Sequence, residues 1–162
     1  MKHFGRKVVY KKWKFDSEKE RDFFIRFIEH SGKRFEVHKS FELKPKTRVC
    51  GYNQHSLRYS PDFVIYDENG EMVHVYDVKT GISDRAVDAA AKIRFVLFGS
   101  RYNMPVEVVV PRRYDFKMKL FGFTDYNIQP LYVRRSNGGK EVHEHYNVYK
   151  TINYDIHDLV GR

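Results

Sequence analysis

Two aspartates and a lysine are spaced so that they could share one face of a β-hairpin. Asn69 and Gly70 stand between two runs of strand-forming residues, and Asn-Gly is typical of a two-residue hairpin turn. Counting pairs outward from that turn places Asp62 directly opposite Asp77. Directly opposed residues have Cβ atoms about 4.5–5.5 Å apart. Lys79, two residues beyond Asp77, projects from the same face.

Opposed carboxylates destabilise a sheet unless something compensates for their charge. Mg²⁺ is a natural compensation, because this hard cation prefers carboxylate and water oxygens. We therefore predict that Asp62 and Asp77 bind Mg²⁺, and that Lys79 orients or deprotonates a bound water or binds a phosphate. The prediction depends on the register, because a three-residue turn would separate the acids. The alternative is two solvated aspartates at strand ends.

Glu20 is a third acid with two interpretations. Ser17 and Glu20 form the pattern of a capping box, in which the glutamate reaches back to the amide of the capping residue. Glu20 also lies four and seven residues before Phe24 and Phe27, so a helix would place it on the apolar face that turns toward a sheet. Glu18 lies on the polar face. The helical phase favours Glu20 as a further metal ligand.

The elements that would position these residues follow from periodicity and from turn signals. In chain order we predict a helix from Ser17 to about Ser31, extended residues 35–48, a loop at 53–56, strands 57–66 and 72–79, a helix at 84–98, a buried strand at 106–110 and a hairpin between 131 and 149. A helix between two strands predicts a crossover into a parallel neighbour. The chain is expected to be one α/β domain with a basic N-terminal arm (1–14), a core (15–112) and a C-terminal β-rich extension (113–162).

The charge balance favours a polyanionic partner. Lys and Arg total 30 against 21 Asp and Glu, a net charge of +9, and each neutralised phosphate releases condensed counterions. The arm has basic residues interleaved with aromatic ones, so it either follows a phosphate backbone or folds back onto the core. The expected nucleic-acid contacts are Lys7, Lys11, Lys12 and Lys14 in the arm, and Lys92, Arg112 and Arg113 beyond it.

Composition excludes several classes of protein. With 162 residues, 41% of them hydrophobic, the chain can bury a core as one domain. One cysteine allows no intrachain disulfide. The N-terminus lacks the apolar segment of a signal peptide, and no apolar run is long enough to cross a membrane. We expect a cytoplasmic protein without a membrane partner or a small-molecule cofactor.

The acids and the lysine carry a family likeness. Pro61-Asp62 followed by Asp77-Val78-Lys79 resembles the PD-(D/E)XK nuclease signature, with Asp in the variable acid position. The segments around these residues add to the likeness, since Phe15-Asp16-Ser17-x-x-Glu20 would open a helix and Tyr76 to Gly81 would end a strand. Over residues 13–112 the chain is similar to small phage-encoded endonucleases of this superfamily that are related to Holliday-junction resolvases.

The resemblance implies a restriction-endonuclease-like core, in which a mixed central sheet is flanked by helices. It implies phosphodiester hydrolysis with Glu20, Asp62, Asp77 and Lys79 as catalytic residues, and dependence on Mg²⁺ or Mn²⁺. It also implies a homodimer acting on branched or double-stranded DNA, in the host cytoplasm if a phage encodes it. Residues 113–162 match no pattern and are expected to hold the substrate-specific part.

Three functions remain open at this point. The first is a structure-specific endonuclease for branched DNA of replication or recombination. The second is a sequence-specific endonuclease of restriction or transposon-end type, against which the short chain counts mildly. The third is a non-catalytic DNA-binding protein on a nuclease fold, against which the complete set of Glu20, Asp62, Asp77 and Lys79 argues.

Overall fold

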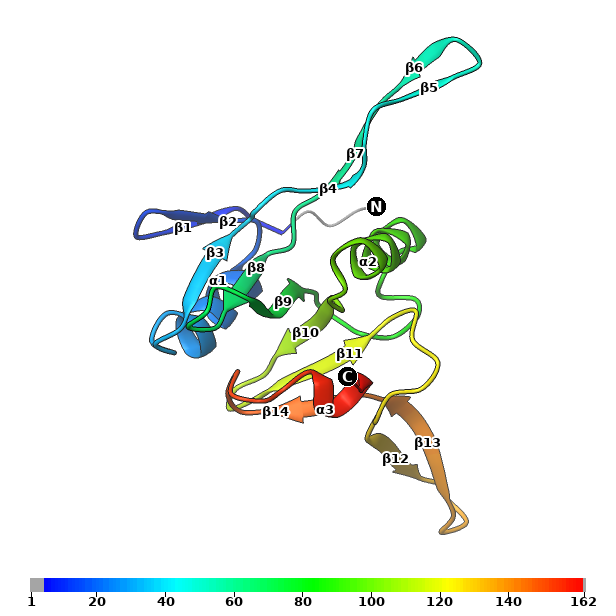
Figure 1. The fold of residues 1–162 in the computed structure, drawn as a ribbon. Coiled ribbons are helices and arrows are strands. Elements are labelled where there is room, and N and C mark those ends of the chain that lie inside the picture. Colours follow the sequence, from blue (N-terminus) through cyan, green and yellow to red (C-terminus); the bar gives the residue numbers. More distant parts are fainter. Residues whose placement is uncertain (1–4, 162) are drawn as a thin grey trace.

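A mixed, mostly antiparallel sheet organises the computed structural model, which describes residues 5–161 (Figure 1). Within these residues the sheet has six strands in the order β14-β11-β10-β9-β8-β3. Their bounds are β3 (Arg34–Val37), β8 (Phe63–Tyr66), β9 (Met72–Val78), β10 (Glu107–Pro111), β11 (Phe116–Leu120) and β14 (Asn147–Tyr149). Strand β9 pairs in parallel with β10, and the helix α2 (Ala89–Tyr102) connects them. The α/β class and the predicted parallel neighbour are therefore confirmed.

The β8–β9 hairpin has the predicted register but not the predicted turn. Val64 faces Val75, as expected for a two-residue Asn-Gly turn. The turn is wider, however, because the Asp67 carboxylate accepts hydrogen bonds of 2.9 Å from the amides two and four residues further on. A register shift follows Ile65, so that Tyr66 pairs with Met72 instead of Val73. This irregularity compensates for the wider turn, so Asp62 and Asp77, at the far end of the hairpin, keep the predicted register relative to each other.

Helix α1 (Glu18–Phe23) continues as the π-helical turn η1 (Phe24–Ile28) and packs on the sheet. The predicted helix is confirmed, although it ends a few residues earlier than expected. The Phe23 ring lies 5.2 Å from the Tyr76 ring and 5.1 Å from the Phe116 ring, in edge-to-face geometry. These aromatic contacts anchor α1 to β9 and β11.

Helix α2 begins later than predicted. Ser83 does not start it, because the Ser83 hydroxyl accepts from the Ala86 amide within a turn, and Asp88 becomes the N-cap. The helix ends at Asn103, which adopts a left-handed conformation. Among residues 5–161 no helix is long and apolar enough to cross a membrane.

A two-stranded ribbon is inserted between β3 and β8. It consists of β4 (Phe41–Lys44) paired with β7 (Leu57–Tyr59) and, further out, β5 (Thr47–Val49) paired with β6 (Tyr52–Gln54). Figure 1 shows it projecting past α2, away from the sheet. The loop expected at 53–56 and the unbroken strand expected at 57–66 were wrong, because β6 occupies part of the former and residues 60–62 interrupt the latter.

The N-terminal arm belongs to the fold from residue 8 onward. Strands β1 (Val8–Tyr10) and β2 (Trp13–Phe15) form a hairpin, and the Trp13 ring packs 4.8 Å from the Phe24 ring. The Tyr10 hydroxyl donates a hydrogen bond of 3.0 Å to Glu29. Of the two interpretations of the arm, folding back onto the core is therefore correct for these aromatics. Residues 1–4 lie outside the described residues.

The C-terminal extension widens the main sheet. Strand β11, which the sequence patterns did not reveal, pairs antiparallel with β10, and β14 pairs with β11. The expected hairpin is present as β12 (Pro130–Arg134) and β13 (Lys140–His145), and the chain ends with the short helix α3 (His157–Val160).

A buried polar network attaches the C-terminal segment to the centre of the sheet. The Glu107 carboxyl group contacts His74 Nδ1 at 2.8 Å and accepts a hydrogen bond of 2.6 Å from the Tyr154 hydroxyl. The Tyr154 hydroxyl is in turn 2.8 Å from that of Tyr76. Because Glu107 and His74 are inaccessible to water, the hydrogen bonds of this network replace those that the two side chains would make to water in the unfolded chain.

Replacing Tyr154 by Phe should destabilise the protein by about 1–3 kcal/mol, because a buried carboxyl oxygen loses its donor. Tyr114→Phe is the matched control, since Tyr114 is largely exposed and should have little effect. Urea unfolding at constant m-value measures both changes. Equal midpoints for the two variants would contradict the assigned role of the network.

Candidate functional site

The structure brings Asp62, Asp77 and Lys79 together at one end of the β8–β9 hairpin. Asp62 immediately precedes β8, and its Oδ2 accepts a hydrogen bond of 2.6 Å from the amide of Val78. Asp77 lies near the end of β9, and Lys79 directly follows the strand with its Nζ 2.5 Å from Asp77 Oδ1. The register of the hairpin thus produces the proximity that the sequence predicted.

Asp77 is buried, with 5% of its surface exposed. Its Oδ2 accepts a hydrogen bond of 2.7 Å from the hydroxyl of Tyr59 in β7. Among the described residues, Asp77 Oδ1 is buried without a partner in hydrogen-bond geometry, although the Lys79 ammonium is close. Burial, together with the Asp77 charge, raises the pKa of Tyr59 well above its ordinary value, so this tyrosine stays a donor. The Lys79 ammonium is therefore the group that compensates Asp77 Oδ1.

Glu20 takes part in the cap of α1 and also contacts a second side chain, His38. Its amide donates to the Ser17 hydroxyl at 3.1 Å, and its Oε2 accepts from the amide of Asp16 at 2.9 Å. The capping interaction thus reaches Asp16 instead of the predicted Ser17 amide. Glu20 is also 2% exposed, and its Oε1 contacts His38 Nε2. Since one carboxylate oxygen serves each contact, capping does not keep Glu20 out of the site.

His38, which the sequence analysis missed, connects Glu20 to Asp62. It follows β3, donates its amide to the Asp62 carbonyl at 3.1 Å, and places Nε2 3.9 Å from Asp62 Oδ1. Its φ of 54° lies in the left-handed region, which non-glycine residues seldom occupy. The hydrogen bond to Glu20 raises the pKa of His38. No spacing rule links a histidine to an acid across an inserted ribbon, so the sequence held no signal for it.

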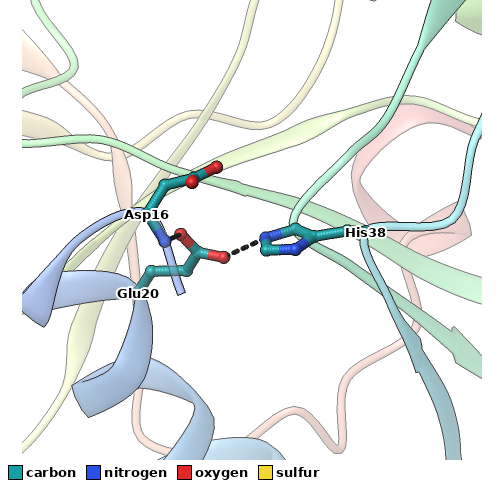
Figure 2. A group of neighbouring side chains, drawn as sticks. All are labelled: Asp16, Glu20 and His38. Atoms are coloured by element: carbon teal, nitrogen blue, oxygen red, sulfur yellow. Dashed lines mark hydrogen bonds and ion pairs between the residues drawn. The ribbon is translucent and has the colours of Figure 1, made fainter. Parts of the chain in front are cut away.

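One group of ligand atoms in residues 5–161 is tight enough to hold a metal ion. It consists of Asp16, Glu20 and His38, whose ligand atoms lie within 4.8 Å of one another. Figure 2 shows Glu20 between the other two, bonded to the Asp16 backbone and to the His38 ring. Asp62 and Asp77, the other predicted ligands, are not members of this group. Two carboxylates and an imidazole form a mixed donor set that suits Mn²⁺ or Zn²⁺ as well as Mg²⁺.

The charges at the site are poorly balanced. Burial raises the pKa of Asp62 well above its ordinary value, and the charges of Asp77 and Glu20 raise it further, against the Val78 amide and Lys79. For Lys79, burial favours the neutral form, but the Asp77 carboxylate outweighs burial and raises the pKa. The lysine therefore stays charged, and carboxylates still outnumber the cations that face them.

The basic residues of the N-terminal arm are dispersed and partly engaged. Lys11 forms an ion pair with Glu29, and Lys7 lies 4.0 Å from Asp16. Lys12 lies over the Trp13 ring, while Lys14 is exposed. The arm therefore offers fewer free cations than its sequence suggests.

The other predicted nucleic-acid contacts are also held by neighbours. Arg112 makes hydrogen bonds of 2.5 and 2.9 Å to Asp115, and Lys92 lies 3.6 Å from Asp84. Arg113 lies over the ring of Tyr114.

The fold and the site together define a mixed α/β protein with a cluster of buried carboxylates at one end of its central hairpin. Residues 1–109 match a family described as a protein of unknown function, DUF1064, and the chain belongs to this family. The matched segment includes Asp16, Glu20, His38, Asp62 and Asp77. No curated protein and no solved structure matches the chain.

Asp62→Asn should stabilise the metal-free protein, increasingly so as the pH rises. A raised pKa means that ionising Asp62 costs the folded state free energy. This cost is absent below the ordinary pKa of 3.8 and complete above the raised one. Asp77 and Glu20 repel the negative charge of Asp62, while Lys79 and His38 attract it. In the variant, the side-chain carbonyl oxygen of Asn can still accept the hydrogen bond from the Val78 amide.

Urea unfolding in a chelator at about pH 4 and about pH 8 measures this effect. The exposed Asp125→Asn variant is the control and should show no pH-dependent gain. A variant less stable than wild type at about pH 8 would show that Asp62 is compensated by its neighbours.

Proposed function

We propose that this protein is a Mg²⁺-dependent DNA endonuclease of the PD-(D/E)XK kind. The observation that carries the proposal is that Asp62, Asp77 and Lys79 lie together at one end of the β8–β9 hairpin. Glu20 is linked to them by His38, which contacts Glu20 and lies 3.9 Å from Asp62. These residues come from α1 and from two neighbouring strands. Solvated strand-end acids would have no reason to be buried together.

The order of elements supports a restriction-endonuclease-like core. Helix α1 is followed by β3, β8 and β9, which pair antiparallel, then by α2 and by β10, which pairs in parallel with β9. This order is the one that the resemblance implies: helix, antiparallel strands, helix, strand. The inserted ribbon and the C-terminal strands are additions to it.

The residues of the site fit a divalent cation. Asp77 Oδ1 is buried with the Lys79 ammonium 2.5 Å away as its ion-pair partner, and Asp62 lies among carboxylates that disfavour its ionisation. In this proposal Asp62, Asp77 and Glu20 would hold Mg²⁺, with Mn²⁺ as a substitute, after closing around the ion, because among residues 5–161 only Asp16, Glu20 and His38 already have ligand atoms within 4.8 Å of one another. When bound, the ion acidifies a water and neutralises charge on the scissile phosphate.

The chain's own groups prepare this site. Tyr59 fixes one oxygen of Asp77, and Asp77 in turn keeps Lys79 protonated beside the acids. A protonated lysine there binds a phosphate oxygen and orients the attacking water, which favours these roles over that of general base. His38 holds Glu20 toward Asp62.

DNA is the proposed substrate because of the net charge of +9 and the family resemblance. Branched or junction DNA, a homodimeric state and a cytoplasmic location are parts of the same proposal. Incubation with Mg²⁺ and duplex, single-stranded, flapped and four-way DNA tests it. Junction preference supports the structure-specific enzyme, defined duplex sites support a sequence-specific one, and binding without cleavage supports a non-catalytic protein.

Asp77→Asn should lower cleavage by at least about 100-fold, because several kcal/mol of charge stabilisation depend on this carboxylate. DNA binding should largely persist, and chelation should abolish cleavage by the wild type. Glu68→Gln, which removes an exposed acid at the turn of the same hairpin, is the control. Wild-type rates for Asp77→Asn in Mg²⁺ would refute the site.

Glu20→Gln should reduce turnover far more than Glu18→Gln. Both acids lie in the first turn of α1, but Glu20 is buried against His38 while Glu18 is exposed. Unfolding must be followed in parallel, since losing part of the cap costs on the order of 1 kcal/mol. Equal, mild effects on turnover would assign Glu20 to capping alone.

A further inference from the structure

The ribbon between β3 and β8 has a fixed base and a free tip. At the base, Phe41 packs against Phe98 of α2 with ring centroids 5.0 Å apart, and the Tyr102 hydroxyl donates to the Glu42 carbonyl at 2.7 Å. At the tip, every residue of β5 and β6 is exposed. An isolated two-stranded ribbon is marginally stable in water, so the tip gains from a partner that covers it.

The charge of the ribbon identifies the chemistry of that partner. Between His38 and Asp62 the chain carries five Lys and Arg residues, and its one acid, Glu42, pairs with Arg101 at 3.1 Å. Lys39 pairs with Glu36 at 2.8 Å, and the other four cations have no carboxylate within 4.0 Å among residues 5–161; they are Lys44, Lys46, Arg48 and Arg58. Three of them donate hydrogen bonds to neutral oxygens of the ribbon, namely Lys44, Arg48 and Arg58, so their charge is not neutralised. Cations without an acidic partner along an exposed ribbon match a line of phosphates.

The two faces of the tip differ. Arg48 pairs with Asn53 across the strands, and both side chains project from one face, whereas Val49 and Tyr52 pair on the other. The B-DNA major groove admits a two-stranded ribbon, where Arg and Asn are side chains that contact base edges. Val49 and Tyr52 add an apolar face that can cover sugars.

The base of the ribbon coincides with the candidate site. The ribbon leaves the sheet at His38 and returns at Asp62, and the backbone bond from His38 to Asp62 closes it. We propose that the ribbon, residues 39–61, is a DNA-gripping arm that lies in the groove of duplex DNA beside the phosphate that the site cleaves. This inference rests on the proposed nuclease function and adds how that enzyme holds its substrate.

The length of the ribbon sets its reach. From Phe41 to Cys50 at the tip, a strand rising about 3.3 Å per residue spans about 30 Å. One turn of B-DNA is about 34 Å. The tip therefore lies within about one helical turn of the scissile phosphate.

The charge test compares two triple variants in metal-free buffer, so that binding is measured without cleavage. Lys44→Gln/Lys46→Gln/Arg48→Gln removes cations from the arm, and Arg134→Gln/Arg135→Gln/Lys140→Gln removes as many from the exposed β12–β13 hairpin. The arm variant should bind duplex DNA more weakly, with a slope of log affinity against log salt lower by up to about 0.9 per lost phosphate contact. The control should keep the wild-type slope.

Cys50, the one cysteine of the chain, offers an independent measurement because it is exposed at the tip. An iron chelate tethered to it should cut bound duplex DNA within about 10 base pairs of the Mg²⁺-dependent cut. Cys50→Ser, carried through the same labelling, gives the background.

The two proposals fail separately. Equal salt slopes for both triple variants, or tethered cutting no higher than the background, overturn the arm and leave the nuclease untouched. A weakened arm variant with tethered cutting above the background, but no cleavage by the wild type in Mg²⁺, supports the contact between the arm and duplex DNA and overturns the nuclease. A wild type that binds no DNA overturns both.

Discussion

The repulsion between the buried acids Asp77 and Glu20 and the half-buried Asp62, at one end of the β8–β9 hairpin, is the interaction to which the surrounding structure responds. Asp62 and Asp77 are brought together by the pairing of their strands, and Glu20 is added from α1. Like charges that are removed from water disfavour folding unless they are paired or hydrogen-bonded. Burial of the apolar core must therefore offset the free energy that these carboxylates cost the folded state, as is common where residues are selected for binding and not for stability.

Each group that contacts the acids comes from a different part of the chain. The Val78 amide and Lys79 come from β9, the Tyr59 hydroxyl from the ribbon strand β7, and the His38 ring from the residue that begins the ribbon. Residues at the base of the ribbon therefore contact the acids directly, in addition to lying beside them in the fold. At the other side of the sheet centre, the Glu107 network has every polar group satisfied. The two buried carboxyl groups thus differ in their partners, since Glu107 contacts His74 and Tyr154, whereas Asp77 faces the Lys79 ammonium beside two other acids.

The sequence predicted the α/β class, helix α1, the register of β8 with β9 and the parallel neighbour β10, because hydrophobic period and strand alternation are local signals. It placed Asp62, Asp77 and Lys79 together for the same reason. It missed the wide turn at Asp67, where hydrogen bonds to the Asp67 carboxylate replace the expected two-residue Asn-Gly turn. The predicted register of the acids was still correct, because a register shift after Ile65 compensates for the wider turn. It missed His38 and Tyr59, because their closeness to the acids depends on how the ribbon leaves and rejoins the sheet. The charge count did not take account of acidic partners within the protein, since Lys11 pairs with Glu29, which the fold brings near, and Arg112 pairs with Asp115, three residues further on.

The position of the ribbon has a structural consequence of its own. Because the amide of His38 bonds to the carbonyl of Asp62, the two ends of the insertion lie side by side, and the strands β3 and β8 pair below them without interruption. A ribbon of any length fits on such a base without changing the register of the sheet, and loop closure becomes only slowly more costly as a loop grows. The left-handed backbone of His38 makes the sharp exit from β3 and also aims the imidazole at Glu20. One residue thus turns the chain into the ribbon and lies against two acids, so the path of the ribbon and the placement of the imidazole depend on the same backbone position.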